Sequence, residues 1–175
     1  GFQPDFLWTK ERTEATYPGL RNSVTGVTKS VSSAMTITEQ TETDGVTAFT
    51  STGFNLSGDG YFYVNRTGKT MVGWSWKAGG TAVSNTDGTI TSSVSANPTA
   101  GFSVVGYTSP GTNADGTVGH GLSQATEMVI AKNLDSAYNW DVWTPALTSG
   151  YDLRLNTTDG QTAGRWSTTI PSASL

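Results

Sequence analysis

A repeated segment constrains the fold of this chain more than any other feature. Residues 4–10 (PDFLWTK) and residues 126–132 (TEMVIAK) each place an acidic residue ahead of a short apolar run that ends in lysine. The two lysines lie 122 positions apart (132 minus 10), and a second apolar stretch follows each copy, around residues 20–31 and 140–155. Self-similarity at a fixed spacing is the signature of tandem structural units. The sequence therefore predicts one and a half to two degenerate copies of one unit.

The repeat also predicts where the units begin and end. Residues 1–80 form a first β unit, residues 81–100 a linker or hairpin, and residues 101–175 a second β unit. Residues 101–122 precede the second copy without a counterpart before the first, and residues 53–77 follow the first copy without a counterpart after the second. We therefore expect a piece of a longer array, with the front strands of one unit and the back strands of the other missing or supplied elsewhere. The alternative is that the two partial units complete each other in a single fold.

The composition favours strands over helices. Threonine, serine and glycine are abundant; threonine is stiff at its first torsion, serine competes for backbone hydrogen bonds, and glycine costs about 1 kcal/mol in a helix interior. Short apolar runs between turn residues predict an all-β, antiparallel, jelly-roll-like β-sandwich. Six Trp, six Tyr and six Phe favour a packed core over disorder. The expected strands are 6–8, 23–35, 61–64, 70–77, 102–107, 128–131, 140–143 and 151–156, and the strongest hairpin pattern joins 61–64 to 70–77.

Charge and hydropathy argue against two classes of partner. The net charge is −4 and no basic run is present, whereas nucleic-acid binding needs clustered Lys and Arg. No apolar run approaches the roughly 18 to 20 residues that cross a bilayer. Cysteine is absent, so the chain has neither disulfides nor thiolate metal sites. We expect no nucleic-acid partner and no membrane insertion.

Four segments resemble repeat units in large structural proteins of tailed bacteriophages. They are residues 1–10 (GFQPDFLWTK), 22–27 (NSVTGV), 73–80 (GWSWKAGG) and 118–122 (VGHGL). Those units look like the concanavalin A-like, laminin-G-like jelly roll. The resemblance implies a virion surface protein such as a tail fibre, spike or capsid decoration, whose partners are identical subunits or other virion proteins. The second copy departs from the pattern, because Thr126-Glu127-Met128 stands where the proline, aspartate and aromatic residue are usual.

The sequence offers little support for an enzyme. His120 is the only histidine and lies between two glycines, which suits a turn. No Gly-x-Ser-x-Gly elbow is present to position a nucleophile, and no acid stands in an alternating Glu-x-Asp-x-Glu strand that would point carboxylates into one cleft. We predict no catalytic residue. A glycan depolymerase is the least favoured alternative.

Metal binding is weighed against ordinary turns at three places. Residues 85–88, 113–116 and 156–160 each offer an amide and a carboxylate before glycine. Calcium prefers six to eight oxygen ligands, whereas an isolated Asn/Asp-Gly segment is usually a β-turn. One histidine and no cysteine are too few ligands for zinc. We expect no cofactor, with a structural calcium ion as the less favoured alternative.

Glycan binding is the functional hypothesis that the sequence supports best. Sugar rings stack on Trp or Tyr, while their hydroxyls need polar side chains nearby. The candidate residues are Tyr138, Asn139, Trp140, Asp141 and Trp143, together with Tyr61 and Arg66. The competing interpretation is that the closely spaced tryptophans 74, 76, 140 and 143 line the core of the sandwich. The sequence thus predicts a structural and adhesive virion module that gains avidity from many copies, with a host-surface glycan as ligand. A purely structural lattice or decoration protein without ligand is the alternative.

Overall fold

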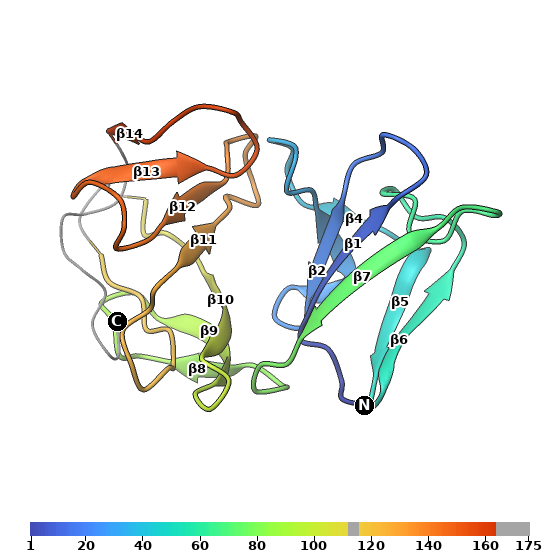
Figure 1. Cartoon of the computed structure of the whole chain (residues 1–175). Helices are drawn as coiled ribbons and strands as arrows, with labels where there is room; N and C mark the ends of the chain where they lie inside the picture. The colour runs from blue at the N-terminus through green and yellow to red at the C-terminus, as the bar shows by residue number, and fades with distance from the viewer. Residues whose placement is uncertain (112–115, 164–175) are drawn as a thin grey trace.

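The computed structural model describes residues 1–111 and 116–163, and every regular element in those residues is a β-strand (Figure 1). The pairs between strands are antiparallel throughout. The all-β prediction is therefore confirmed, as the shortage of good helix formers implies. Jelly-roll connectivity stays a prediction.

The first and largest sheet has five strands in the order β4-β3-β2-β1-β7. These strands are β1 (Phe6–Glu11), β2 (Gly19–Asn22), β3 (Gly26–Val31), β4 (Gln40–Thr41) and β7 (Met71–Trp76). The hairpin of β5 (Gly45–Thr50) and β6 (Gly53–Ser57) lies beside this sheet (Figure 1). Along β1, buried and half-buried side chains alternate, because successive residues of a strand point to opposite faces.

Two smaller sheets follow in the chain. The first contains β8 (Val83–Asn85), β9 (Ser92–Asn97) and β10 (Phe102–Tyr107) in the order β10-β9-β8. The second contains β11 (Val129–Ala131), β12 (Asp141–Trp143), β13 (Tyr151–Arg154) and β14 (Thr162–Ala163) in sequential order. β8 and β9 pair antiparallel and fall inside the segment 81–100, which the sequence assigns to a linker or hairpin.

The strand pairings repeat at the spacing found in the sequence. β11, β12, β13 and β14 correspond to β1, β2, β3 and β4, and every compared pair is shifted by the same 122 positions (132 minus 10) with no insertion. The equivalent pairs are Leu7↔Arg21 with Val129↔Trp143, Trp8↔Leu20 with Ile130↔Val142, Leu20↔Val31 with Val142↔Leu153, Lys29↔Thr41 with Tyr151↔Ala163, and Ser30↔Gln40 with Asp152↔Thr162. The internal repeat is thus a repeat of structure.

The two lysines that end the repeated segments make the same contacts. Each side chain donates to the backbone carbonyl of the next residue and to that of the residue four positions on. Lys10 Nζ lies 3.2 Å from Glu14 O, and Lys132 Nζ lies 3.4 Å from Ser136 O. A lysine supplies three donors, so it satisfies carbonyls of the loop that the strand enters. This shared role explains why lysine closes both copies.

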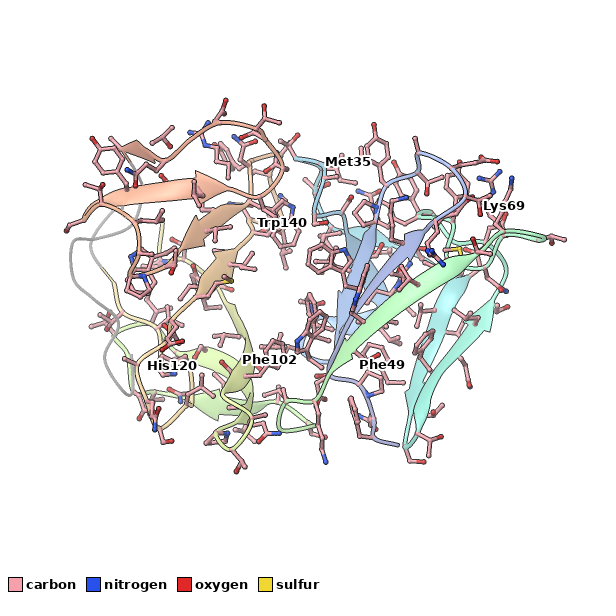
Figure 2. All side chains as sticks on the ribbon, in the orientation of Figure 1. Met35, Phe49, Lys69, Phe102, His120 and Trp140 are labelled. Atoms are coloured by element: carbon pink, nitrogen blue, oxygen red, sulfur yellow. The ribbon has the colours of Figure 1, made fainter. Side chains whose placement is uncertain are left out.

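Two apolar clusters hold the sheets together. Leu7, Val46 and Val64 form the first, between β1 and the β5–β6 hairpin; Val27, Phe49 and Phe54 pack against it (Phe49 is labelled in Figure 2). Leu20, Val31 and Trp140 form the second, where the two repeat units meet; Phe6, Trp8, Leu134 and Leu155 pack against it. The five-stranded sheet therefore packs against other parts of the chain on both faces.

The predicted strand 61–64 is wrong. Tyr63 has a φ of 53° and Gly60 a φ of 67°, so the chain turns there. Val64 N donates to Asp59 O at 2.7 Å across the turn, which places Phe62 and Val64 in the interior while the tyrosines stay outside. The alternation of Tyr61, Phe62, Tyr63 and Val64 resembles a strand because a tight turn also buries alternate side chains. β7 pairs with β1 and not with this segment.

Candidate binding surface

Aromatic side chains gather on one face of the β1–β7 pair. The register places Phe6 opposite Trp76 and Trp8 opposite Trp74, so all four lie on the same side of the sheet. Phe6 and Trp76 meet edge-to-face with ring centroids 5.4 Å apart, and Trp8 and Trp74 do so at 6.1 Å. Gly73 and Ser75 alternate with the tryptophans and face the other side. The strand pairing thus builds a continuous aromatic row.

Phe102 of β10 joins this row from the other half of the molecule (Figure 2). Its ring stacks on Trp76 with a centroid distance of 6.2 Å and an interplanar angle of 24°, and meets Phe6 edge-on at 6.1 Å. We call Phe6, Trp8, Trp74, Trp76 and Phe102 the aromatic face. Trp74 remains 48% exposed and Trp76 37% exposed. The face therefore combines a rigid frame with two indoles that solvent reaches.

Two of the predicted sugar-binding residues lie in the interior of the protein. Trp140 and Trp143 are buried. Trp140 packs on Leu20 and Val31, and its Nε1 donates to Ser32 O at 2.7 Å. In this arrangement neither indole presents a face to a sugar ring. Both tryptophans are therefore buried, as the competing interpretation expects.

The other members of the first predicted group surround the start of β12. Tyr138 is exposed and Asp141 is half-buried. Asn139 accepts a hydrogen bond from Asn156 Nδ2 at 2.9 Å, and Asn156 Oδ1 accepts from Trp140 N, also at 2.9 Å. Asn156 thereby links the segment before β12 to the end of β13. Glycan binding by this group stays a prediction.

The second predicted pair, Tyr61 and Arg66, lies in the loop before β7. Tyr61 is exposed and packs edge-on against Phe62. Arg66 Nη1 lies 3.1 Å from Glu11 and 3.1 Å from Glu14, and its guanidinium sits 4.9 Å from the centre of the Tyr63 ring. Arg66 therefore already has carboxylate and aromatic partners. This loop and the start of β12 belong to different repeat units, so the structure does not unite the two predicted groups.

Glu14 sits at the centre of an exposed charge cluster. Hydrogen bonds from Lys69 and Arg66 lower the pKa of the Glu14 carboxyl, because they stabilise its charged form. All three side chains reach solvent. Exposed ion pairs contribute little to stability. The cluster fixes the loop before β7 near the end of β1.

Arg21 and Glu42 form a buried ion pair that no pattern in the sequence predicts. Arg21 Nη2 lies 2.7 Å from Glu42 Oε1, and both side chains are shielded from solvent. Glu42 also accepts from Ser30 Oγ and, at 2.8 Å, from Tyr61 N. Burial lowers the pKa of Arg21, and Glu42 opposes that effect. The pair ties β2 to the turn at residues 61–64, which is a structural role.

His120 has the turn geometry that its flanking glycines predict. Its Nδ1 accepts from Leu122 N at 3.0 Å, and Gly121 has a φ of 70°. The side chain is buried. Within residues 1–111 and 116–163, no three His, Cys, Asp or Glu side chains gather where they could hold a metal ion.

The turn candidates for calcium have mainly local contacts. Asp87 N donates to Asn85 Oδ1 at 2.8 Å, and Asn85 Nδ2 donates to Asp87 Oδ2 at 3.0 Å, which is an Asx turn. In the candidate at residues 156–160, the side chain of Asn156 bonds to Asn139 and Trp140. Most of the third candidate, residues 113–116, lies outside the described residues.

The fold and surface define the class as an all-β protein of antiparallel sheets, with a four-strand unit that occurs twice. The chain belongs to the family described as a domain of unknown function (DUF7483), whose model matches residues 1–175. Neither the comparison with curated proteins nor that with solved structures finds a match. In the described part of the chain, no helix is long and apolar enough to cross a membrane.

Proposed function

We propose that this chain is a structural and adhesive module of a virion surface protein, such as a tail fibre, spike or capsid decoration, and that the aromatic face binds a glycan. The virion assignment follows from the sequence resemblance. The binding assignment rests on one observation: Trp74 and Trp76 are both exposed at alternate positions of β7, and each packs against an aromatic ring of β1. A pyranose ring has an apolar face that stacks on an indole. A preformed pair of indoles loses little side-chain entropy on binding.

Multivalency would strengthen an adhesive function. A single exposed aromatic pair binds a sugar weakly, because few polar groups add to the stacking. The chain carries one such pair, on β7, so further copies of the site come from further chains. Several modules joined in one particle raise the effective concentration of each site, so the avidity exceeds the affinity of any one copy.

The test is a titration with oligosaccharides monitored by tryptophan fluorescence. α-Glucan, β-glucan and N-acetylglucosamine oligosaccharides serve as probes for wild type, Trp74→Ala and Tyr17→Ala. Tyr17 is an exposed aromatic residue outside the aromatic face and provides the matched control. We expect at least one probe to bind wild type and Tyr17→Ala equally, and to bind Trp74→Ala at least tenfold more weakly. Equal binding by Trp74→Ala, or no binding by wild type, would reject the aromatic face as a glycan site.

A purely structural module is the second candidate, and the exposed apolar residues in β11 and immediately before it favour it. Met128 and Ile130 are both exposed. Exposed apolar side chains at a strand edge suit burial against another protein surface. This candidate predicts association that is independent of any sugar.

A further inference from the structure

One edge of β11 is open. In the described part of the chain, β11 pairs with β12 and has no strand on its other side. Its residues Val129, Ile130 and Ala131 include neither the charge nor the proline that usually protects an edge strand. Met128 is 60% exposed and Ile130 45% exposed. The edge therefore offers both unpaired backbone groups and uncovered apolar side chains.

The first repeat unit shows what covers the equivalent edge. β1 occupies the place of β11, and its corresponding edge pairs with β7 along all six residues from Phe6 to Glu11. At the offset of 122 (132 minus 10), Met128 takes the position of Phe6 and Ile130 that of Trp8. In the first unit these positions are packed by Trp76 and Trp74. The same geometry would bring two aromatic side chains onto Met128 and Ile130.

A second feature of the first unit also has a counterpart. Asp5 is buried, and its Oδ2 accepts hydrogen bonds from Ala78 N at 2.8 Å and Gly80 N at 3.3 Å, which fixes the chain leaving β7. Glu127 stands at the position equivalent to Asp5 and is exposed. It offers a carboxylate where the backbone after an incoming strand would arrive.

We infer that the open edge of β11 is a strand-acceptor site, and that its occupant is an antiparallel strand of the β7 type other than β7 itself. The required chemistry is two aromatic residues at alternate positions with a small residue between them, as in Trp74-Ser75-Trp76. The Trp-Ser-Trp sequence occurs once in residues 1–175, and that copy is already paired with β1. The donor is therefore a second strand of this type. In the equivalent register, its aromatic residues face Ile130 and Met128.

A peptide with the sequence of residues 70–80 (TMVGWSWKAGG) tests this site directly. The peptide carries a fluorophore, and its anisotropy is followed as the full chain is added. The control peptide replaces both tryptophans with serine and keeps the length and charge. We expect saturable binding of the first peptide and at least tenfold weaker binding of the second, because strand addition draws specificity from alternate side chains. Equal binding of the two peptides, or none by the first, would overturn the inference.

Two variants of the chain locate the binding. Ile130→Lys puts a charge on the edge of β11, while Val83→Lys makes the same kind of change at an exposed position of β8, the edge strand of another sheet. We expect Ile130→Lys to weaken peptide binding at least tenfold and Val83→Lys to leave it unchanged. Equal losses in both variants would contradict a site on β11.

Hydrogen exchange on the wild-type chain gives a readout that needs no variant. The amides of Val129–Ala131 are expected to exchange at least severalfold more slowly with the peptide bound. Faster exchange at Met71–Trp76 with no change at Val129–Ala131 would show that the peptide instead displaces β7. The other possible occupant of the edge is a second copy of the chain, and sedimentation of the chain alone tests for it. If the chain associates and Ile130→Lys abolishes the association, the edge binds a second copy of the chain, and the inference of a separate donor strand is overturned.

Discussion

At the scale of single residues, side chains with similar sequence patterns differ in how deeply the fold buries them. Trp140 and Trp143 are interior, whereas Trp74 and Trp76 line an exposed face. Arg21 is the opposite case, because a charged residue lies in the interior with Glu42 as its partner. In the second unit the equivalent position holds Trp143, so one site in the fold accepts either a paired charge or an indole.

Glu42→Gln is expected to destabilise the protein strongly. The change leaves the guanidinium of Arg21 buried without a counter-charge, which costs about 3 to 5 kcal/mol. Urea unfolding measures the effect. The double variant Arg21→Leu/Glu42→Leu should recover most of the loss, because it removes both charges together.

Glu39→Gln provides the control for this experiment. It removes one partner of the more exposed Lys29–Glu39 pair, whose N–O distance is 3.9 Å. The expected change in unfolding free energy is below about 1 kcal/mol. Equal losses in Glu42→Gln and Glu39→Gln would contradict the role assigned to the buried pair.

At the scale of elements, strands with strong local patterns are predictable and tight turns are not. The predicted strand 102–107 coincides with β10, and 70–77 contains β7. The hairpin of β5 and β6 falls in a stretch that reads mainly as polar. The segment 61–64 fails because local alternation does not reveal the positive φ of Tyr63. The alternation of side chains along the sequence predicts which of them are buried, but it does not predict the backbone conformation that buries them.

Leu7→Ala is expected to cost more stability than Trp76→Ala. Leu7 is fully buried at the centre of the first apolar cluster, so truncation leaves a cavity and costs about 2 to 5 kcal/mol. Trp76 is larger but already partly in solvent, so less of its apolar surface returns to water when it is truncated. Thermal unfolding of the two variants compares them. A larger loss for Trp76→Ala would show that the aromatic face belongs to the core.

At the scale of the whole molecule, Trp140 is a buried side chain at the contact between the two repeat units. Trp140 of the second unit packs on Leu20 and Val31 of the first and donates to Ser32 O. Nearby, Glu39 N donates to Leu134 O at 2.9 Å, and Lys132 Nζ lies 3.3 Å from Thr36 O. The contact between units is therefore made of the second apolar cluster, the packing of Phe102 on Phe6 and Trp76, and a few hydrogen bonds.

Trp140→Ala is expected to uncouple the two units. The change removes the largest member of the second apolar cluster, at a cost of about 3 to 5 kcal/mol. Calorimetry should then show two transitions in place of one, because each unit keeps its own sheet. Tyr138→Ala, an exposed aromatic change two residues away, should leave the unfolding profile unchanged. A single transition at the wild-type temperature in Trp140→Ala would show that the units are joined elsewhere.

The sequence by itself determined the strand-rich fold and the repeat spacing of 122 (132 minus 10), because both follow from local composition and from the order of side chains along the chain. Tertiary structure alone decided which tryptophans are exposed, that Arg21 meets Glu42, and that among the described strands β11 pairs only with β12. The physical reason is that exposure and pairing depend on strands distant in sequence. β7 pairs with β1 across a long stretch of chain, since Phe6 and its partner Trp76 are 70 positions apart (76 minus 6), and no local pattern encodes that pairing.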